Sequence, residues 1–416
     1  MLPPASEDFT RDILSTSLDV DVTTHLATAT ITLAASDSTG ASFEIGDLDI
    51  SAVRTAGPLN FETHDGTLDV GLPAGETTLT IDYQYADHDM FDGALASGVT
   101  FTWPYFCGNL FPCHSDPADG TAFALALSGV PDGEAAIFPA EIPADAPPYM
   151  LAWAVGDYTR IELGETGDQT SVSVWVLPGE EEAARAGTAH LVDVFDFYET
   201  TYGSYRFGEE VGSVSAPWGP GAYGGMEHHP FWHVASDAMG DEEVHAHEAA
   251  HGWFGDGVRI RCWEDFVLSE GTASYLAARA LTEVAGTATG DAVWESYERR
   301  LDSAQASATL KIAWPEGCGQ IDIIQDGLFT DIPYMKGALF YRALAARVGE
   351  DELDNALRVF YGTYRGSAAG MQDLLDVVAT ETGYDPTECA DAWLRSAALP
   401  AGTSICPSVV VPARRR

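Results

Sequence analysis

Alternation of apolar and polar residues dominates the first part of the chain. Residues 17–22 and 27–33 alternate strictly, and clusters of turn-forming residues such as 37–40 separate the runs. A period of two is typical of strands that bury one face. The pattern therefore predicts an all-β domain over residues 1–182.

Helical periodicity takes over after the acidic run at residues 180–182. Apolar side chains recur three and four positions apart over residues 183–202, which predicts an amphipathic helix. We therefore expect an α+β protein with a second domain over residues 183–406 and a C-terminal tail over residues 407–416. Further helices are predicted at residues 241–256, 265–282, 335–348, 352–364 and 370–382.

Size, composition and charge narrow the class of protein. The chain has 416 residues, 46% of them hydrophobic, so it can bury a core in two or three domains. No run approaches the roughly 20 apolar residues of a membrane-spanning helix, so membrane insertion is not expected. A formal net charge of -44 makes nucleic acid an unfavourable partner. Only two lysines occur, and a halophilic source and a GC-rich coding bias both explain that scarcity.

Six cysteines point to an oxidising compartment. An even number without C-x-x-C spacing favours disulfides over a zinc ribbon, although six reduced cysteines in a cytosolic protein are the alternative. We therefore expect a secreted, periplasmic or cell-surface protein. Since residues 1–4 lack the features of a signal peptide, an exported protein would have lost its leader. The simplest arrangement pairs sequence neighbours: Cys107 with Cys113, Cys262 with Cys318, and Cys389 with Cys406.

Six of the eleven histidines fall between residues 228 and 251. Two of them begin and end the run His247-Glu248-Ala249-Ala250-His251. On a helix, His247 and His251 share a face, so their neutral imidazoles can bind one zinc ion while Glu248 lies beside it. Glu270 follows after 18 residues and can supply a third ligand from a second helix. Three protein ligands leave one position for water, as in catalytic zinc sites, so we expect one Zn2+ per chain.

Two further segments carry candidate substrate-binding and catalytic groups. Gly224, Gly225 and Met226 directly precede Glu227. The glycines would let a substrate backbone approach closely, and Glu227 offers a carboxylate beside the metal. Downstream, Tyr334 offers a phenol close to one of the two lysines.

Together these segments resemble the aminopeptidase N and leukotriene hydrolase family of zinc metallopeptidases, the gluzincins. The resemblance implies a saddle-like N-terminal β-domain followed by a thermolysin-like domain that hydrolyses peptides. It also implies a short form, because the chain ends before the family's C-terminal helical domain. The matching segments are residues 111–118, 224–227, 247–255, 263–275 and 334–337.

The same resemblance assigns roles to the candidate residues. Glu248 would accept the proton of the attacking water, and Tyr334 would donate a hydrogen bond to the oxyanion. Glu227 would bind the free α-ammonium of the substrate, while the backbone of residues 224–226 would pair with the extended peptide. The implied zinc ligands are His247, His251 and Glu270.

Two positions depart from the family pattern. His228 stands where the family usually has asparagine, and Trp103 stands where an acidic or amide residue helps to hold the substrate amine. Recognition of a free amine then depends more heavily on Glu227. Without the helical domain, the cleft is expected to admit longer peptides.

Each assignment has a plainer alternative. The histidines of the zinc motif could be surface residues, Glu248 a solvated helix residue, Glu227 a surface carboxylate and Tyr334 a core tyrosine. Asp265 could support a zinc-bound histidine or simply begin a helix. Structural or exposed positions are favoured for His228, His229 and His233 over positions in the cleft.

A zinc aminopeptidase acting on peptides is the preferred function. The alternatives are a zinc endopeptidase without a strict need for a free amine, and a peptide-binding homologue that has lost catalysis. The sequence carries no signal for the oligomeric state.

Overall fold

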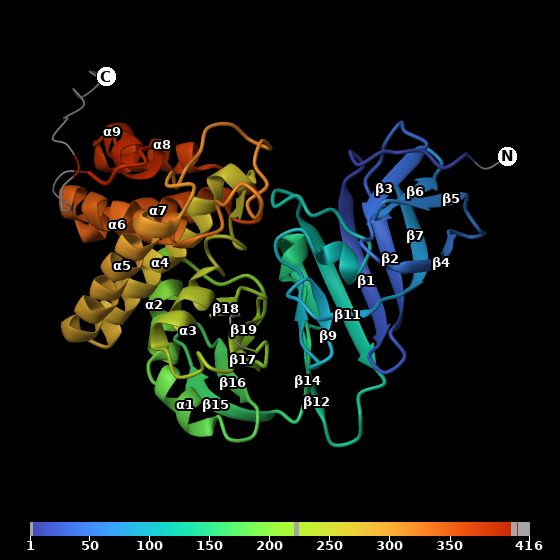
Figure 1. Ribbon diagram of the computed structural model, residues 1–416, viewed down its shortest axis with the longest axis horizontal. Coiled ribbons are helices and arrows are strands. Elements are labelled where there is room, and N and C mark those ends of the chain that lie inside the picture. The colour runs from blue at the N-terminus through green and yellow to red at the C-terminus, as the bar shows by residue number, and fades with distance from the viewer. Residues whose placement is uncertain (1–2, 220–223, 401–405, 407–416) are drawn as a thin grey trace. The chain divides into compact units, whose positions relative to one another are not determined.

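The computed structural model describes residues 3–219, 224–400 and 406, which form two compact units (Figure 1). A β-rich first part precedes a helical part, which confirms the predicted α+β class. As far as they are described, the first unit contains Met1–Leu163, Ser171–Arg185 and Phe207–Gly240, and the second contains Gly164–Thr170, Ala186–Arg206 and Asp241–Arg416. The units thus interleave, so the single boundary after residue 182 stays a prediction, and the predicted tail, residues 407–416, lies outside the described residues.

A six-stranded sheet, in the order β13-β11-β1-β2-β7-β4, forms the main layer of the first unit (Figure 1). The predicted alternation is present in β2, where Ala29, Ile31 and Leu33 are fully buried and the intervening threonines are half-buried. A second sheet has the order β3-β6-β5. The strands of this region are β1 (Ile13–Asp21), β2 (Leu26–Leu33), β3 (Gly40–Glu44), β4 (Asp49–Arg54), β5 (Phe61–His64), β6 (Thr67–Gly71), β7 (Thr77–Gln84), β8 (Asp87–His88), β9 (Gly93–Leu95), β10 (Thr100–Phe101), β11 (Thr121–Ser128), β12 (Ala135–Ile137), β13 (Glu141–Ala146) and β14 (Ala154–Gly156).

A five-stranded sheet with the order β15-β16-β17-β19-β18 contains parallel pairs in its centre. The short strand β18 pairs antiparallel with β19 and carries Gly225 and Met226, so the sheet positions the segment that precedes Glu227. The bounds are β15 (Thr159–Glu165), β16 (Ser171–Val176), β17 (Glu210–Ala216), β18 (Gly225–Met226) and β19 (Phe231–Ala235).

Helices dominate the second unit, and their bounds correct several predictions. The helix predicted at 183–202 is two helices, because the first ends at Gly187 and the chain turns before the second begins. The helix predicted at 241–256 already ends at Ala250, since the following residues form turns. The helices are α1 (Glu181–Gly187), α2 (Leu191–Tyr202), α3 (Glu242–Ala250), α4 (Phe266–Val284), α5 (Thr287–Ser307), α6 (Asp331–Val348), α7 (Glu350–Tyr364), α8 (Met371–Thr382) and α9 (Thr387–Ala390); strands β20 (Arg259–Ile260) and β21 (Ala368–Ala369) form a short parallel pair.

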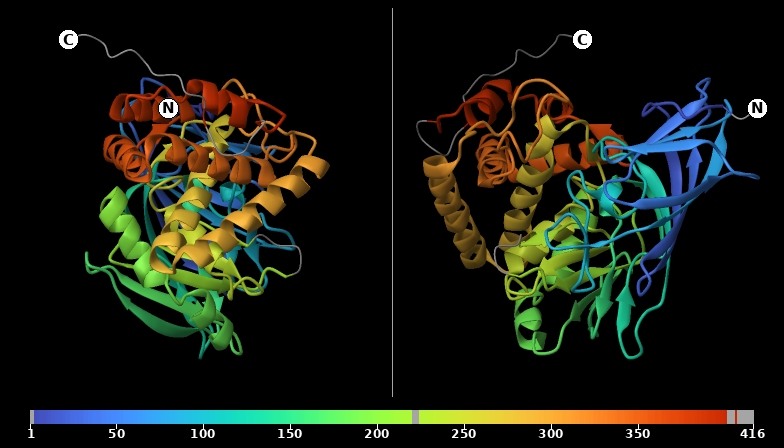
Figure 2. Two further views of the ribbon diagram at one scale, coloured as in Figure 1. Left: turned by 90° about the vertical axis from the view of Figure 1, so that its left-hand side faces the viewer. Right: turned by 45° about the vertical axis from the view of Figure 1, so that its right-hand side comes forward.

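Helices α4 and α6 approach each other closely at two glycines. A Cβ atom on Gly271 would lie 2.7 Å from the Cα of Gly337, and one on Gly337 would lie 2.4 Å from the Cα of Gly271. Only glycine fits at such a backbone contact. Because Gly271 follows Glu270 and Gly337 lies one helical turn after Tyr334, this contact fixes two predicted site residues relative to each other. Figure 2 shows the long light-orange helix α5, which packs against both α4 and α6.

Three disulfides join the cysteines as predicted: Cys107 with Cys113, Cys262 with Cys318, and Cys389 with Cys406. Each bridge lies within one compact unit. Among the described residues, none of the helices has the length and apolar character needed to cross a membrane.

Candidate metal centre and active site

Helix α3 places two imidazoles side by side. Asp241 caps its N-terminus by accepting a hydrogen bond from the Glu243 backbone N–H at 3.1 Å. His247 lies in the helix and His251 is its C-cap residue; four residues apart, the two lie on one face, as predicted. Their ring centroids are 4.8 Å apart, and their Nε2 atoms are 3.1 Å apart.

The other ring nitrogen of each histidine has its own partner. His251 Nδ1 lies 3.0 Å from the carbonyl oxygen of Phe254 and 3.2 Å from Ser269 Oγ. A carbonyl only accepts, so Nδ1 donates and Nε2 of the neutral ring keeps its lone pair. Gly255 permits this packing, because a Cβ there would lie 2.7 Å from His251 Nδ1 and its φ is +116°. His247 Nδ1 lies 3.3 Å from Ser274 Oγ.

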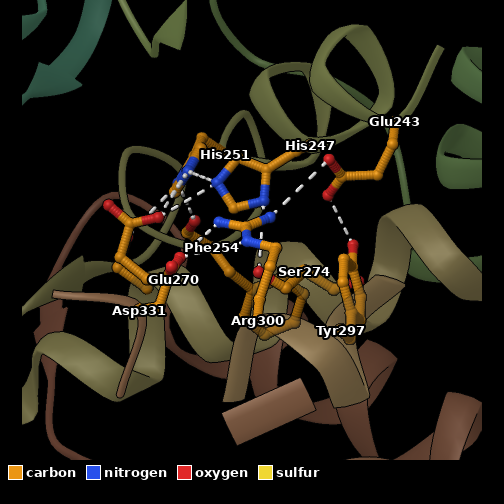
Figure 3. Close-up of polar contacts among 10 residues, drawn as sticks. Glu243, His247, His251, Phe254, Glu270, Ser274, Tyr297, Arg300 and Asp331 are labelled. Carbon is orange, nitrogen blue, oxygen red and sulfur yellow. Dashed lines mark hydrogen bonds and ion pairs between the residues drawn. The ribbon is translucent and has the colours of Figure 1, made fainter. Parts of the chain in front are cut away.

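Glu270 brings a carboxylate to the two lone pairs from helix α4. Its Oε2 lies 3.0 Å from His247 Nε2 and 3.3 Å from His251 Nε2, and all three side chains are buried (Figure 3). Burial on its own raises the pKa of the Glu270 carboxyl, whereas a proton on the facing nitrogens of His251 and His247 lowers it overall; a zinc ion in place of that proton would act in the same direction. Glu270 is therefore held as a carboxylate.

These three donors fit a zinc ion. Ligand atoms at 2.0–2.2 Å from a tetrahedral zinc are about 3.3 to 3.6 Å from one another, and the three distances observed here, 3.0, 3.1 and 3.3 Å, are close to this range. Two imidazole nitrogens and one carboxylate oxygen are the donor set of catalytic zinc sites. Hydrogen bonds from the outer imidazole nitrogens, as seen here, orient such ligands.

Two predicted catalytic residues lie beside this group within the same unit. Glu248 follows His247 on α3 and is 5% exposed, so it is not a solvated helix residue. The Tyr334 ring stacks on the His247 ring with centroids 5.8 Å apart and an interplanar angle of 21°. Tyr334 also contacts Phe266 and is partly exposed, so its phenol is not part of a closed core.

The predicted substrate-binding segment belongs to the first unit. Gly224 precedes β18, Gly225 and Met226 form it, and the buried Glu227 follows directly. Trp103, which stands where the family has an acidic or amide residue, is also buried in this unit. Its indole offers no carboxylate to a substrate amine. The roles of these residues in substrate binding therefore stay proposals.

The three histidines that follow Glu227 are buried, which agrees with a structural position. His228 Nδ1 lies 2.9 Å from the carbonyl oxygen of Tyr149, and its ring contacts that of His233 at 5.0 Å. Burial lowers the pKa of His228 well below its usual value, and it lowers the pKa of His233 to about 3. His229 is fully buried.

The sequence did not single out the residues that support the metal ligands. Ser269 and Ser274 contact the outer nitrogens of His251 and His247, whereas Asp265 accepts hydrogen bonds from Trp314 and from the Met371 backbone. Asp265 therefore anchors loops, and its possible role as a histidine partner is not seen. The signal that could have identified the two serines is their position on the helix: Ser269 directly precedes Glu270, and Ser274 follows it by one turn.

Lys336, close to Tyr334, is also structural. Its Nζ donates hydrogen bonds to the carbonyl oxygens of Lys311 at 2.7 Å and Ser396 at 2.6 Å. Burial lowers the pKa of its ammonium group to about 8. The amine thus ties a loop and the C-terminal segment to α6.

Two histidines four residues apart and a glutamate on the next helix define the class of gluzincin zinc sites. Comparisons with known proteins agree with this class, because residues 229–393 match the peptidase family M1 domain. Over these residues the chain is similar to this family, the aminopeptidase N family of gluzincins.

The region that aligns with this chain is a different share of each similar protein. Aminopeptidase B of Mus musculus is 27% identical over 292 residues, which are 64% of this chain and 43% of that protein. Aminopeptidase M1-B of Oryza sativa subsp. japonica is 25% identical over 376 residues, or 79% of this chain and 42% of that protein. The chain therefore spans less than half the length of these relatives. A mutant M1 zinc metallopeptidase from Deinococcus radiodurans, crystallised with a Tyr-Ser-Ala substrate, shares the fold with a TM-score of 0.80 at 19% identity, covering 94% of this chain and 96% of that one.

Proposed function

We propose that the protein is a zinc-dependent aminopeptidase that removes N-terminal residues from peptides. One observation carries the proposal: Nε2 of His247 and Nε2 of His251 converge on the Glu270 carboxylate while their Nδ1 atoms are held by other partners. A structural zinc site would have a fourth protein ligand. Among the described residues, the group of possible metal ligands that contains Glu270 also contains His247 and His251.

The residues around the metal have complementary roles. Bound zinc supplies Lewis acidity, which polarises the scissile carbonyl and makes water more acidic. Glu248 accepts the proton of the attacking water and then donates it to the leaving amine. Tyr334 donates a hydrogen bond to the oxygen that becomes negative as the tetrahedral centre forms. Glu227 binds the α-ammonium of the substrate and sets which peptide bond is cleaved.

The names of the similar proteins, and the ligand bound to one of them, support a peptide substrate. The two curated relatives are named aminopeptidases, and the Deinococcus radiodurans neighbour was crystallised with a tripeptide. Neither an endopeptidase nor a silent homologue receives comparable support.

Paired substrates test this function. An aminoacyl anilide and an internally quenched peptide with a blocked amine would be offered to the purified full chain in parallel. We expect cleavage of the anilide and no cleavage of the blocked peptide. Cleavage of the blocked peptide alone would rule out an aminopeptidase, and zinc-loaded protein that cleaves neither would favour a silent homologue.

We also propose that the protein works outside the cytoplasm. Three disulfides that involve all six cysteines support an oxidising compartment. Alkylation of cells of the source organism before lysis would test this, because cytoplasmic protein would carry six modified thiols and exported protein would carry none.

A further inference from the structure

Each helix that carries a site residue has a second polar residue one turn away. On α3, Glu243 lies four residues before His247. On α4, Ser274 lies four residues after Glu270, and on α6, Asp331 lies three residues before Tyr334. Residues three or four apart share a helix face, so these three form a layer next to the site.

Helix α5 connects the members of this layer, although it contributes nothing to the site itself. The Tyr297 hydroxyl lies 2.5 Å from Glu243 Oε1 and 3.0 Å from the Ser274 carbonyl oxygen, so its proton can be donated to either (Figure 3). Arg300, one turn further along α5, donates to Asp331 Oδ1 from NH2 at 2.6 Å and from Nε at 3.1 Å. Its NH1 also lies 4.0 Å from Glu243 Oε2.

Ser274 links this layer directly to a metal ligand. Its hydroxyl lies 3.3 Å from His247 Nδ1, while its carbonyl oxygen contacts Tyr297. Ser274 and Tyr297 are both buried, so water does not compete for these contacts. A displacement of α5 would therefore be transmitted to the orientation of the His247 ring.

We propose that Tyr297 and Arg300 are positioning residues that fix helices α3, α4 and α6 relative to one another. Tyr297 holds the two helices that carry the metal ligands. Arg300 holds the start of α6, and through it the phenol of Tyr334. This inference rests on the proposed function and extends it to residues that touch neither metal nor substrate.

The alternative is that these are ordinary ion pairs between helices, and the chain offers a matched control. Arg342 on α6 and Glu298 on α5 form an ion pair at 3.0 Å between the same two helices, and their side chains are 44% and 57% exposed, compared with 39% for both Arg300 and Asp331. Glu298→Gln and Asp331→Asn therefore make the same chemical change in two α5–α6 ion pairs. Only the second pair connects to the site.

The test measures zinc affinity by chelator competition and the kinetics of anilide cleavage for full-length variants. For Tyr297→Phe, which loses only a hydroxyl, we expect roughly tenfold weaker zinc binding. For Asp331→Asn we expect zinc affinity within about twofold of the wild type and kcat lowered roughly three- to tenfold at unchanged KM. Glu298→Gln should change neither quantity, whatever its effect on the melting temperature.

The proposal is overturned if Tyr297→Phe and Asp331→Asn both match Glu298→Gln in zinc affinity and in kcat. Should Tyr297→Phe fail to fold, the comparison of Asp331→Asn with Glu298→Gln decides. Chelator competition needs no substrate, so wild-type protein that binds zinc but cleaves no anilide would contradict the proposed function and leave the Tyr297 result interpretable.

Discussion

Two pairs of buried histidines, one in each compact unit, have nearly the same geometry and different surroundings. The rings of His247 and His251 are 4.8 Å apart at 78°, and those of His228 and His233 are 5.0 Å apart at 82°. The first pair faces a carboxylate, that of Glu270. Within the described residues, none of the groups of three or more possible metal ligands includes the second pair.

The second pair is surrounded by aromatic rings. Phe101 and Trp218 lie edge-on or tilted against His228 and His233, respectively. Burial keeps these imidazoles neutral, as their lowered pKa values indicate. A metal site therefore requires a shared anionic ligand and partners for the outer nitrogens, and adjacent imidazoles alone do not make one.

Removal of one histidine from each pair should give the largest contrast. His247→Gln should reduce bound zinc from about one ion per chain to less than about 0.1, with at least roughly a 1000-fold loss of kcat/KM, because two ligands remain. His233→Gln should keep about one ion per chain. Metal analysis of dialysed protein measures both. Zinc loss in His233→Gln but not in His247→Gln would reverse the assignment.

Next in size is the effect of Glu248. Glu248→Gln keeps the shape of the side chain but cannot accept a proton, so kcat should fall about 100- to 10,000-fold. Zinc content should stay at that of the wild type, which separates this residue from the metal ligands on the same helix. Wild-type turnover in the zinc-loaded variant would show that Glu248 is not the general base.

A smaller loss is expected for Tyr334. Tyr334→Phe keeps the ring that stacks on His247 but removes the hydroxyl, so kcat should fall about 100-fold with little change in KM. Steady-state kinetics on an aminoacyl anilide measure both constants. An increase in KM alone would place Tyr334 in substrate binding.

The smallest effect concerns stability and the second histidine pair. The pKa of His233 is about 3 in the folded chain, below its unfolded value, so the unfolded chain takes up a proton that the folded chain does not. Above about pH 6.5, His233 does not change the free energy of unfolding. Below that pH, it lowers the free energy of unfolding by about 1.4 kcal/mol per pH unit.

His233→Gln should therefore show a shallower loss of unfolding free energy between about pH 6 and pH 4.5, by about 2 kcal/mol in total. Urea unfolding at several pH values measures the slope, so a constant destabilisation by the substitution does not matter. Identical slopes for variant and wild type would mean that His233 is protonated in the folded chain.

Local sequence was sufficient for much of the fold and for placing two histidines on one helix face. Alternation identified β2, and i, i+4 spacing identified His247 and His251, because both patterns are set by local backbone geometry. Six cysteines without metal spacing were paired correctly as sequence neighbours.

Features that depend on tertiary contacts were not predicted. Helix α5 was missed because its few buried residues are diluted by polar and small ones over Thr287–Ser307. The support of His251 by Phe254 uses a backbone carbonyl, which no residue type reveals. The packing of residues 207–240 with the first unit depends on contacts between strands far apart in sequence.

The central claim is that one zinc ion binds to two imidazoles and one carboxylate of the second unit. Anomalous diffraction at the zinc edge from crystals of the zinc-loaded protein tests it most directly. We predict a single site with Nε2 of His247, Nε2 of His251 and a Glu270 oxygen at about 2.0–2.2 Å, and solvent at the remaining position. Zinc bound by His228 and His233, or a fourth protein ligand on the predicted ion, would contradict it.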